Sequence, residues 1–196
     1  MWAGIALKKI LIAGEAGQTT NYENALAAMQ VHFVTSLQVK DVDEYDGLLL
    51  PGGGDVDPKL FGQLLIPETE IRQYSRWEQQ LIRKGQEKLT PELDRIQLAI
   101  LKAFCQYRKP VFGICKGMQL INIAFGGDML RHLPTAVHHA YREKDQMHPA
   151  RNEVNSFLYE VYGSDMLVNS AHHQGVGIPG RGIRYVQYAP DGVVEG

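Results

Sequence analysis

Short, mainly apolar runs alternate along this chain with longer segments whose apolar residues recur at helical spacing. Residues 10–13, 31–34 and 47–50 form three such runs, and each predicts a short buried strand. Asn21 can cap a helix that continues to about Met29, between the first two runs. Strands that alternate with helices favour a parallel sheet. The pattern therefore predicts an α/β fold with a three-layer, open, mostly parallel sheet and helices on both faces.

The chain becomes more polar after the third strand. Residues 60–88 are rich in charge and predict a partly helical excursion, either a solvated face or a lid over a site. Thr90 then caps a strong helix that has Pro91 at its first position and apolar residues along one face. Residues 131–150 are typical of a loop. Two further strands are predicted in the C-terminal third, at residues 167–170 and 183–189.

Cys115 lies where a predicted strand breaks sharply into a predicted helix. Residues 111–114 read as a short buried strand, and a buried helix follows through Phe125. The pattern Gly113-x-Cys115-x-Gly117 has the shape of the Gly-x-Ser-x-Gly nucleophile elbow, whose small residues let neighbouring backbone approach. The helix points its N-terminal N–H groups at the sulfur, which favours the thiolate. Cys115 is therefore predicted to be a nucleophile; the alternative is an ordinary buried cysteine at the end of a core strand.

A triple-glycine loop follows the third predicted strand, in residues 51–58. Glycines at the carboxyl end of a parallel sheet can expose bare N–H groups to a ligand, which suggests an anion- or oxyanion-binding loop. A flexible turn explains the same residues equally well. The loop is not a phosphate loop of the Walker type, because no Gly-Lys-Ser/Thr follows it.

Other candidate residues are less specific. Gln119 lies one helical turn after Cys115, so it can either reach a substrate at the sulfur or cap a backbone group. His172 and His173 follow a predicted strand and can either donate hydrogen bonds into a cleft or form a polar turn. Four more histidines, in the segment 131–150, have no acidic or cysteine ligands at the usual spacings. We therefore expect no metal site and no cofactor.

Composition narrows the function classes. At 196 residues and 22.0 kDa the chain is expected to form a single domain over residues 1–196. A formal net charge of -2, without a basic run, gives no case for nucleic-acid binding. Two cysteines make no disulfide framework, and no apolar stretch has the length of a secretion signal or membrane span. These features favour a cytoplasmic protein.

Taken together, the motifs resemble the class I glutamine amidotransferase-like superfamily, and more narrowly the peptidase C26 group of γ-glutamyl-γ-aminobutyrate hydrolases, which act in putrescine breakdown. The resemblance implies a flavodoxin-like glutamine amidotransferase fold with the elbow at the C-terminal edge of the sheet, and it suggests a homodimer. The matching segments occur in family order at residues 48–58, 110–122, 125–127, 168–174 and 189–195.

The resemblance also implies roles for individual residues. Cys115 would attack a γ-glutamyl amide and form a thioester, which water would hydrolyse to release glutamate after the amine had left. The backbone N–H groups of Lys116 and of Gly52 or Gly53 would stabilise the oxyanion. The family usually has arginine where Lys116 stands, a difference that should not affect a backbone donor. Gln119 would contact the glutamyl portion, and His173 is the second candidate for substrate binding.

One family motif is missing from the sequence. The family's base and its orienting acid lie in a His-Pro-Glu strand shortly after the position of Glu195, and the sequence contains no such motif. The segment at residues 148–150 lacks the acid. We therefore interpret the chain as an incomplete version of a longer protein or as a crippled member. A γ-glutamyl amide hydrolase is the favoured function, and the alternatives are an ammonia-supplying glutaminase subunit and a catalytically dead γ-glutamyl-binding domain.

Overall fold

The structure, a computed structural model, describes residues 8–196, so the expectation about an N-terminal signal falls largely outside it. The chain forms two compact units. The first comprises the chain up to Val56 together with Thr90–Ala124, and the second comprises Asp57–Leu89 together with Phe125–Gly196. Each unit is described by itself below.

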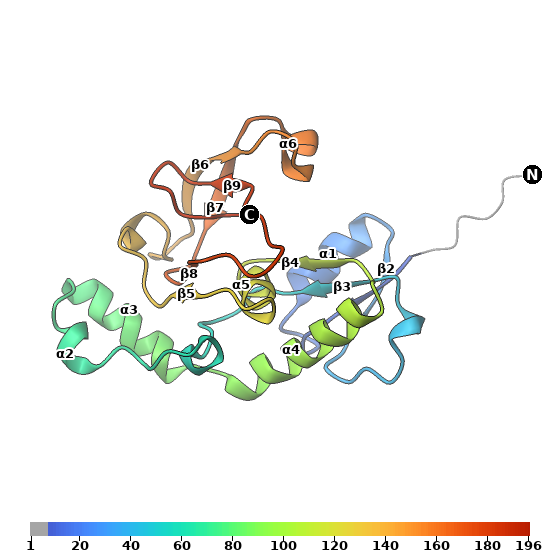
Figure 1. The fold of residues 1–196 in the computed structure, drawn as a ribbon, viewed down its shortest axis with the longest axis horizontal. Helices are drawn as coiled ribbons and strands as arrows, with labels where there is room; N and C mark the ends of the chain where they lie inside the picture. Colours follow the sequence, from blue (N-terminus) through green and yellow to red (C-terminus); the bar gives the residue numbers. More distant parts are fainter. Residues whose placement is uncertain (1–7) are drawn as a thin grey trace, which may run out of the picture. The chain divides into compact units, whose positions relative to one another are not determined.

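The first unit is built on a four-stranded parallel sheet (Figure 1). Its strands are β1 (Lys9–Ile12), β2 (His32–Thr35), β3 (Gly47–Leu50) and β4 (Val111–Gly113). Their order is β2-β1-β3-β4, and every neighbouring pair is parallel. This is the order of a doubly wound flavodoxin-like sheet, in which ligands bind beyond the carboxyl ends of the strands. The predicted fold class is confirmed.

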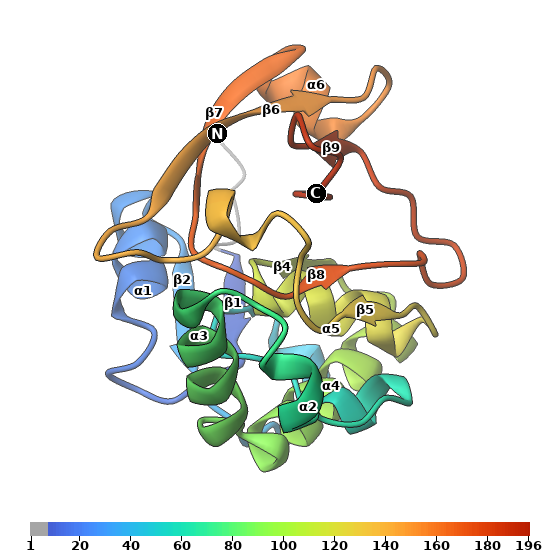
Figure 2. The same cartoon turned by 90° about the vertical axis from the view of Figure 1, so that its left-hand side faces the viewer.

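Helices cover both sides of this sheet. Figures 1 and 2 place α1 (Thr20–Ala28) and α4 (Pro91–Gln106) on opposite sides, and α5 (Lys116–Ala124) packs against α4 and β4. Alternate residues of each strand point to opposite faces, so one set meets α4. The buried apolar core between the sheet and α4 consists of Leu11, Ala13, Val42, Tyr45, Leu48, Leu50, Ile100, Leu101 and Phe104. The buried Gln97 side chain of α4 donates a hydrogen bond of 2.8 Å to the Ala13 carbonyl, which ties α4 to the end of β1.

Short helical segments occupy residues 58–87, where the sequence predicts a partly helical excursion. They are η2 (Pro58–Phe61), α2 (Glu68–Ile71) and α3 (Arg76–Glu87). Ser75 and Glu78 form a capping box at the start of α3, which satisfies two N–H groups that the helix itself leaves unbonded. A small apolar cluster of Ile66, Ile71 and Ile82 is buried among these helices. A further short helix, η1 (Val42–Glu44), belongs to the first unit.

The rest of the second unit is mainly antiparallel. Strands β6 (Gln146–Asn152) and β7 (Asp165–Ser170) form a ribbon, and β9 (Gln187–Tyr188) pairs with the far end of β6. Strands β5 (Met129–Leu130) and β8 (Gly175–Val176) pair with each other. The remaining helices are η3 (Ala136–His138) and α6 (Phe157–Tyr162).

Two predictions for this unit are wrong in extent. Residues 146–150, expected to be loop, belong to β6 despite Pro149. Pro149 faces Leu167 of β7, whereas β9 pairs only with Arg151 and Asn152, so the other edge of β6 needs no N–H at the proline. The strand expected at residues 183–189 is shorter in the structure, where only β9 (Gln187–Tyr188) is a strand. It pairs with just two residues of β6, Arg151 and Asn152. No helix within residues 8–196 is long and apolar enough to cross a membrane.

Candidate active site at the Cys115 elbow

Cys115 lies between the end of β4 and the start of α5, as the sequence predicts. Its backbone has a φ of 51°, in the left-handed region that non-glycine residues rarely adopt. Two hydrogen bonds hold the turn on either side: Ile114 N–H donates to the Leu50 carbonyl at 3.0 Å, and Gly117 N–H donates to the Ile114 carbonyl at 2.9 Å. The side chain is exposed, so the alternative of an ordinary buried cysteine does not describe it.

The two glycines of the elbow are required by close backbone packing. A Cβ on Gly113 would lie 2.6 Å from the Gly117 carbonyl carbon. A Cβ on Gly117 would lie 2.8 Å from the Leu50 carbonyl carbon and would also clash with the Leu50 carbonyl oxygen. Real Cβ atoms essentially never come under 3.0 Å, so α5 can begin this close to β3 and β4 only with glycine at both positions. The Gly-x-Cys-x-Gly pattern is thus a packing requirement of the turn.

The triple-glycine loop lies beside the elbow. A Cβ placed on Gly52 would come within 3.5 Å of the Cys115 Cβ, so the loop after β3 and the turn after β4 are neighbours at one end of the sheet. The Gly52 N–H donates a hydrogen bond of 2.9 Å to the hydroxyl of Tyr22 on α1. Sequence reasoning gave Tyr22 no role, because nothing in the helical pattern of α1 distinguishes it from other half-exposed residues. A Cβ placed on Gly53 would lie 3.0 Å from the Lys116 Cδ, so Gly53 adjoins the first residue of α5.

The backbone N–H and the side chain of Lys116 lie in different surroundings. Its N–H belongs to the first turn of α5, where a helix has no acceptor of its own for the donor. Its side chain is buried and forms an ion pair with Asp94 of α4, with 2.5 Å between Nζ and Oδ1. The Nζ also donates to the Thr90 hydroxyl at 3.4 Å. The sequence predicts only the backbone role, because a buried lysine is rare and its acidic partner lies on another helix.

The two candidate substrate-binding residues are both buried. Gln119, on α5, has its N–H bonded to the Cys115 carbonyl at 3.1 Å. His173 belongs to the second unit, where its Nδ1 lies 3.0 Å from Nδ1 of His132, and the Nε2 of His132 lies 3.4 Å from Glu78. Burial alone would raise the pKa of Glu78, but hydrogen bonds from Ser75 and His132 outweigh it and lower that pKa. The substrate-binding roles of Gln119 and His173 stay predictions.

The second cysteine provides a contrast. Cys105 lies on α4, is half-buried, and packs against the core of the first unit. Burial raises the pKa of the Cys105 thiol, which disfavours the reactive thiolate. Neither cysteine forms a disulfide within residues 8–196.

Solved structures of glutamine amidotransferases have the same fold. One from Thermotoga maritima superposes with a TM-score of 0.61 and covers 96% of this chain and 69% of its own, at 12% sequence identity. A glutamine amidotransferase from Methylobacillus flagellatus gives a TM-score of 0.57, covering 95% of this chain and 63% of its own, at 17% identity. At these identities the likeness concerns the fold alone.

Curated relatives are closer in sequence. Protein NtpR of Enterococcus hirae is 29% identical over 79% of this chain and 61% of its own length. The γ-glutamyl-γ-aminobutyrate hydrolase of Escherichia coli O157:H7 is 28% identical over 82% of this chain and 61% of its own length. The chain therefore spans about three fifths of these relatives. The family model for peptidase C26 matches residues 28–196, which include the triple-glycine loop and the elbow. On that match, the chain belongs to the peptidase C26 family.

Proposed function

We propose that this protein hydrolyses a γ-glutamyl amide through a thioester on Cys115, with a γ-glutamyl-γ-aminobutyrate-like compound as the substrate. The observation that carries the proposal is the exposed Cys115 in a left-handed turn, beside the triple-glycine loop and at the N-terminus of α5. A relative of this family is named for hydrolysis of that compound. The positive end of α5 stabilises negative charge on the sulfur and on an oxygen bound beside it.

The arrangement supports a two-step acyl transfer. The Cys115 sulfur attacks the γ-amide carbon, a C–S bond forms, and the carbonyl electron pair moves to the oxygen. The N–H groups of Lys116 and Gly53 stabilise that oxyanion, and Gly52 joins them only if its bond to Tyr22 opens. Collapse of the intermediate breaks the C–N bond, and the amine leaves with a proton. Water then attacks the thioester, releasing glutamate and restoring the thiol.

This proposal concerns the nucleophile and the oxyanion donors. The proton acceptor of the mechanism is assigned, by family resemblance, to a His-Pro-Glu motif that the sequence does not contain. The curated relatives are longer than this chain. A direct test of Cys115 therefore has to include a reaction that needs no separate base, such as alkylation of the sulfur by an electrophile.

Covalent trapping provides that test. Incubation with a glutamine-like chloroketone is expected to add one glutamyl-sized adduct to Cys115 and none to Cys105, as read by intact mass and peptide mass spectrometry. The half-buried Cys105, with its raised pKa, is the internal control. A simple alkylating agent of similar size, without the glutamyl group, should label Cys115 more slowly. If Cys115 reacts with the simple agent but not with the glutamyl one, a γ-glutamyl substrate is excluded.

Substrate preference separates the hydrolase from the alternatives. We expect glutamate release from γ-glutamyl-γ-aminobutyrate to be faster than ammonia release from glutamine when both are assayed by glutamate formation. A strong preference for glutamine would instead favour a glutaminase that supplies ammonia to a synthetase. Binding of γ-glutamyl-γ-aminobutyrate without turnover, and without trapping of Cys115, would identify a γ-glutamyl-binding domain.

A further inference from the structure

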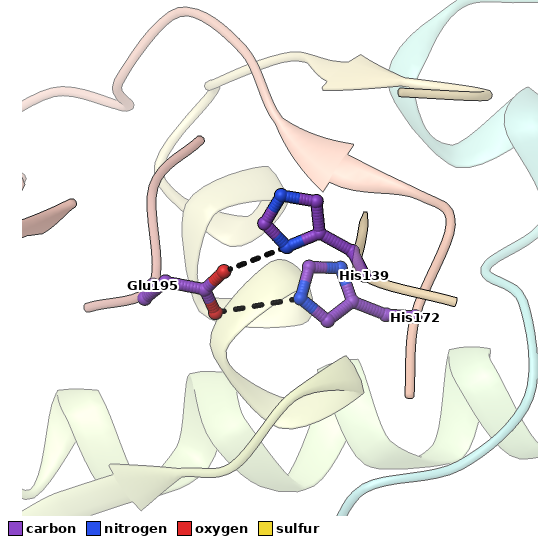
Figure 3. A group of neighbouring side chains, drawn as sticks. All are labelled: His139, His172 and Glu195. Carbon is purple, nitrogen blue, oxygen red and sulfur yellow. Dashed lines mark hydrogen bonds and ion pairs between the residues drawn. The ribbon is translucent and has the colours of Figure 1, made fainter. Parts of the chain in front are cut away.

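Three histidines surround one carboxylate in the second unit, and one of them, His172, directly precedes His173 in the sequence. His139 follows η3, His148 lies on β6, His172 follows β7, and Glu195 lies near the end of the chain. The Glu195 Oε1 lies 3.1 Å from His139 Nδ1 and 3.4 Å from His148 Nε2, and its Oε2 lies 3.4 Å from His172 Nε2. Figure 3 shows His139 and His172 directing ring nitrogens at the two oxygens of Glu195.

The outer nitrogens of two of these rings fix where their protons lie. His172 Nδ1 is 2.9 Å from the Gln174 carbonyl, and His148 Nδ1 is 3.0 Å from the Pro149 carbonyl. A carbonyl oxygen only accepts hydrogen bonds, so each Nδ1 must carry a proton. In a neutral imidazole the other nitrogen then has a lone pair. When these two rings are neutral, their Nε2 atoms therefore present lone pairs to Glu195.

His139 completes the arrangement with a carboxylate behind it. Its Nε2 lies 2.9 Å from Asp191 Oδ2, on the side of the ring opposite Glu195. A proton on Nε2 satisfies Asp191, and in a neutral ring the Nδ1 lone pair then faces Glu195. A carboxylate that orients a histidine in this way is the usual outer partner of a metal-binding imidazole. The His139 side chain is 1% exposed, so water cannot take the place of these partners.

Lone pairs directed at a carboxylate repel it unless a positive charge lies between them. Separate protons on several adjacent buried rings would place like charges together, at a high desolvation cost. One divalent cation at the centre supplies the positive charge between the ring nitrogens and the carboxylate without protonating the rings. Metal–ligand bonds of about 2.0–2.1 Å in a tetrahedron separate neighbouring ligand atoms by roughly 3.3 Å. Here His139 Nδ1 lies 3.1 Å from Glu195 Oε1 and His172 Nε2 lies 3.4 Å from Oε2, and one ligand atom from each of the three residues lies within 4.8 Å of the others.

We propose that His139, His172 and Glu195 bind a divalent transition-metal ion, with Zn²⁺ best suited to the two imidazoles and one carboxylate. Ligand atoms of these residues all lie within 4.8 Å of one another. His148 adds a third imidazole beside Glu195, and Asp191 orients His139. Because these residues come from segments that are distant in the chain, the ion would have a structural role and hold the segment around Glu195 to η3 and β7.

A pocket lies next to the cluster. Its volume is about 410 Å³, and it is lined by His138, Gln146, Met147, His148, Pro190 and Asp191. It shares His148 and Asp191 with the cluster, so the pocket adjoins the proposed centre. The spacing of the histidines along the sequence predicts no metal site, because spacing rules describe ligands held by one local motif, and this set is gathered by the fold.

The test first removes bound metal from the protein with a chelator. Zn²⁺ is then titrated into the protein in competition with a chromophoric chelator, whose absorption reports the free ion. The titration uses the Cys115→Ser variant, which removes the exposed thiol as a competing ligand. We expect one equivalent to bind and to raise the thermal midpoint. His139→Ala and Glu195→Gln should each weaken binding by more than about 100-fold, and Asp191→Asn by about 10- to 100-fold. Co²⁺ in place of Zn²⁺ should give the visible absorption of a tetrahedral site.

His138→Ala is the matched control, because His138 adjoins His139 in the sequence but is exposed. The His138→Ala variant should bind Zn²⁺ with unchanged affinity. Circular dichroism of each variant without metal shows whether it is folded, and Glu195→Gln keeps the side-chain shape if His139→Ala fails to fold. The proposal is overturned if the starting protein binds no Zn²⁺ equivalent, or if folded Glu195→Gln binds as tightly as the protein with Glu195. Equal losses in His138→Ala and His139→Ala would also overturn it.

Discussion

Replacement of Cys115 with alanine is expected to abolish the proposed hydrolysis of a γ-glutamyl amide, with a loss in kcat on the order of 10⁴- to 10⁶-fold. The oxyanion donors remain in the variant, but the only other cysteine in residues 8–196 is Cys105, on α4, so no thiol is left at the elbow to attack the amide carbon. Glutamate release and the mass of the trapped enzyme both measure the effect. Cys105→Ala, on the same unit, should keep full activity.

A second variant at the same position tests the backbone strain. Cys115 has a φ of 51°, a conformation that costs a side-chain-bearing residue about 1–2 kcal/mol and glycine almost nothing. After the higher entropy of glycine in the unfolded chain is subtracted, Cys115→Gly should be roughly 0.5–1 kcal/mol more stable than Cys115→Ala. Urea unfolding of the two inactive variants measures this difference. A less stable glycine variant would mean that the turn is not strained.

Replacement of Asp94 with alanine is expected to lower the free energy of unfolding by about 3–5 kcal/mol, the usual cost of leaving one charge of a buried pair alone. The Asp94 and Lys116 side chains are 0% and 3% exposed, and 2.5 Å separates Oδ1 from Nζ. Without Asp94 the lysine must lose its proton or distort the start of α5. Because α5 begins directly after Cys115, activity should fall with stability.

The double variant Asp94→Ala/Lys116→Met distinguishes charge pairing from packing. Once both charges are gone, the loss of stability should be clearly smaller than the sum of the two single losses. Arg95→Ala is the surface control, since its pair with Glu92 lies on the same helix α4 and both side chains are largely exposed. That change should have little effect. A loss below about 1 kcal/mol for Asp94→Ala would mean that water reaches the pair.

The local pattern was sufficient for the elements that build the first unit. Strands β1 and β3 are short apolar runs with buried residues, as expected for strands covered on both faces. Strand β4, expected to be buried, has Phe112 60% exposed. The elbow was also predictable, because two glycines that flank a cysteine between a strand and a helix are typical of such a turn. In the structure Gly113 packs against Gly117, and Gly117 packs against Leu50 of β3. The second unit was predicted less well. Its strand β6 is polar and contains Pro149, and only its pairing partners make it a strand.

The amino-acid sequence by itself determined the parallel sheet, its helices, the cysteine at the turn and the glycine loop after β3. Each of these features leaves a mark within a few residues of sequence, as an apolar run, a helical period or a pair of glycines. Tertiary structure alone decided that Tyr22 bonds Gly52, that Lys116 meets Asp94, and that three imidazoles gather around Glu195. Those contacts join segments far apart in the chain, and their strength comes from burial and charge, which no local pattern encodes.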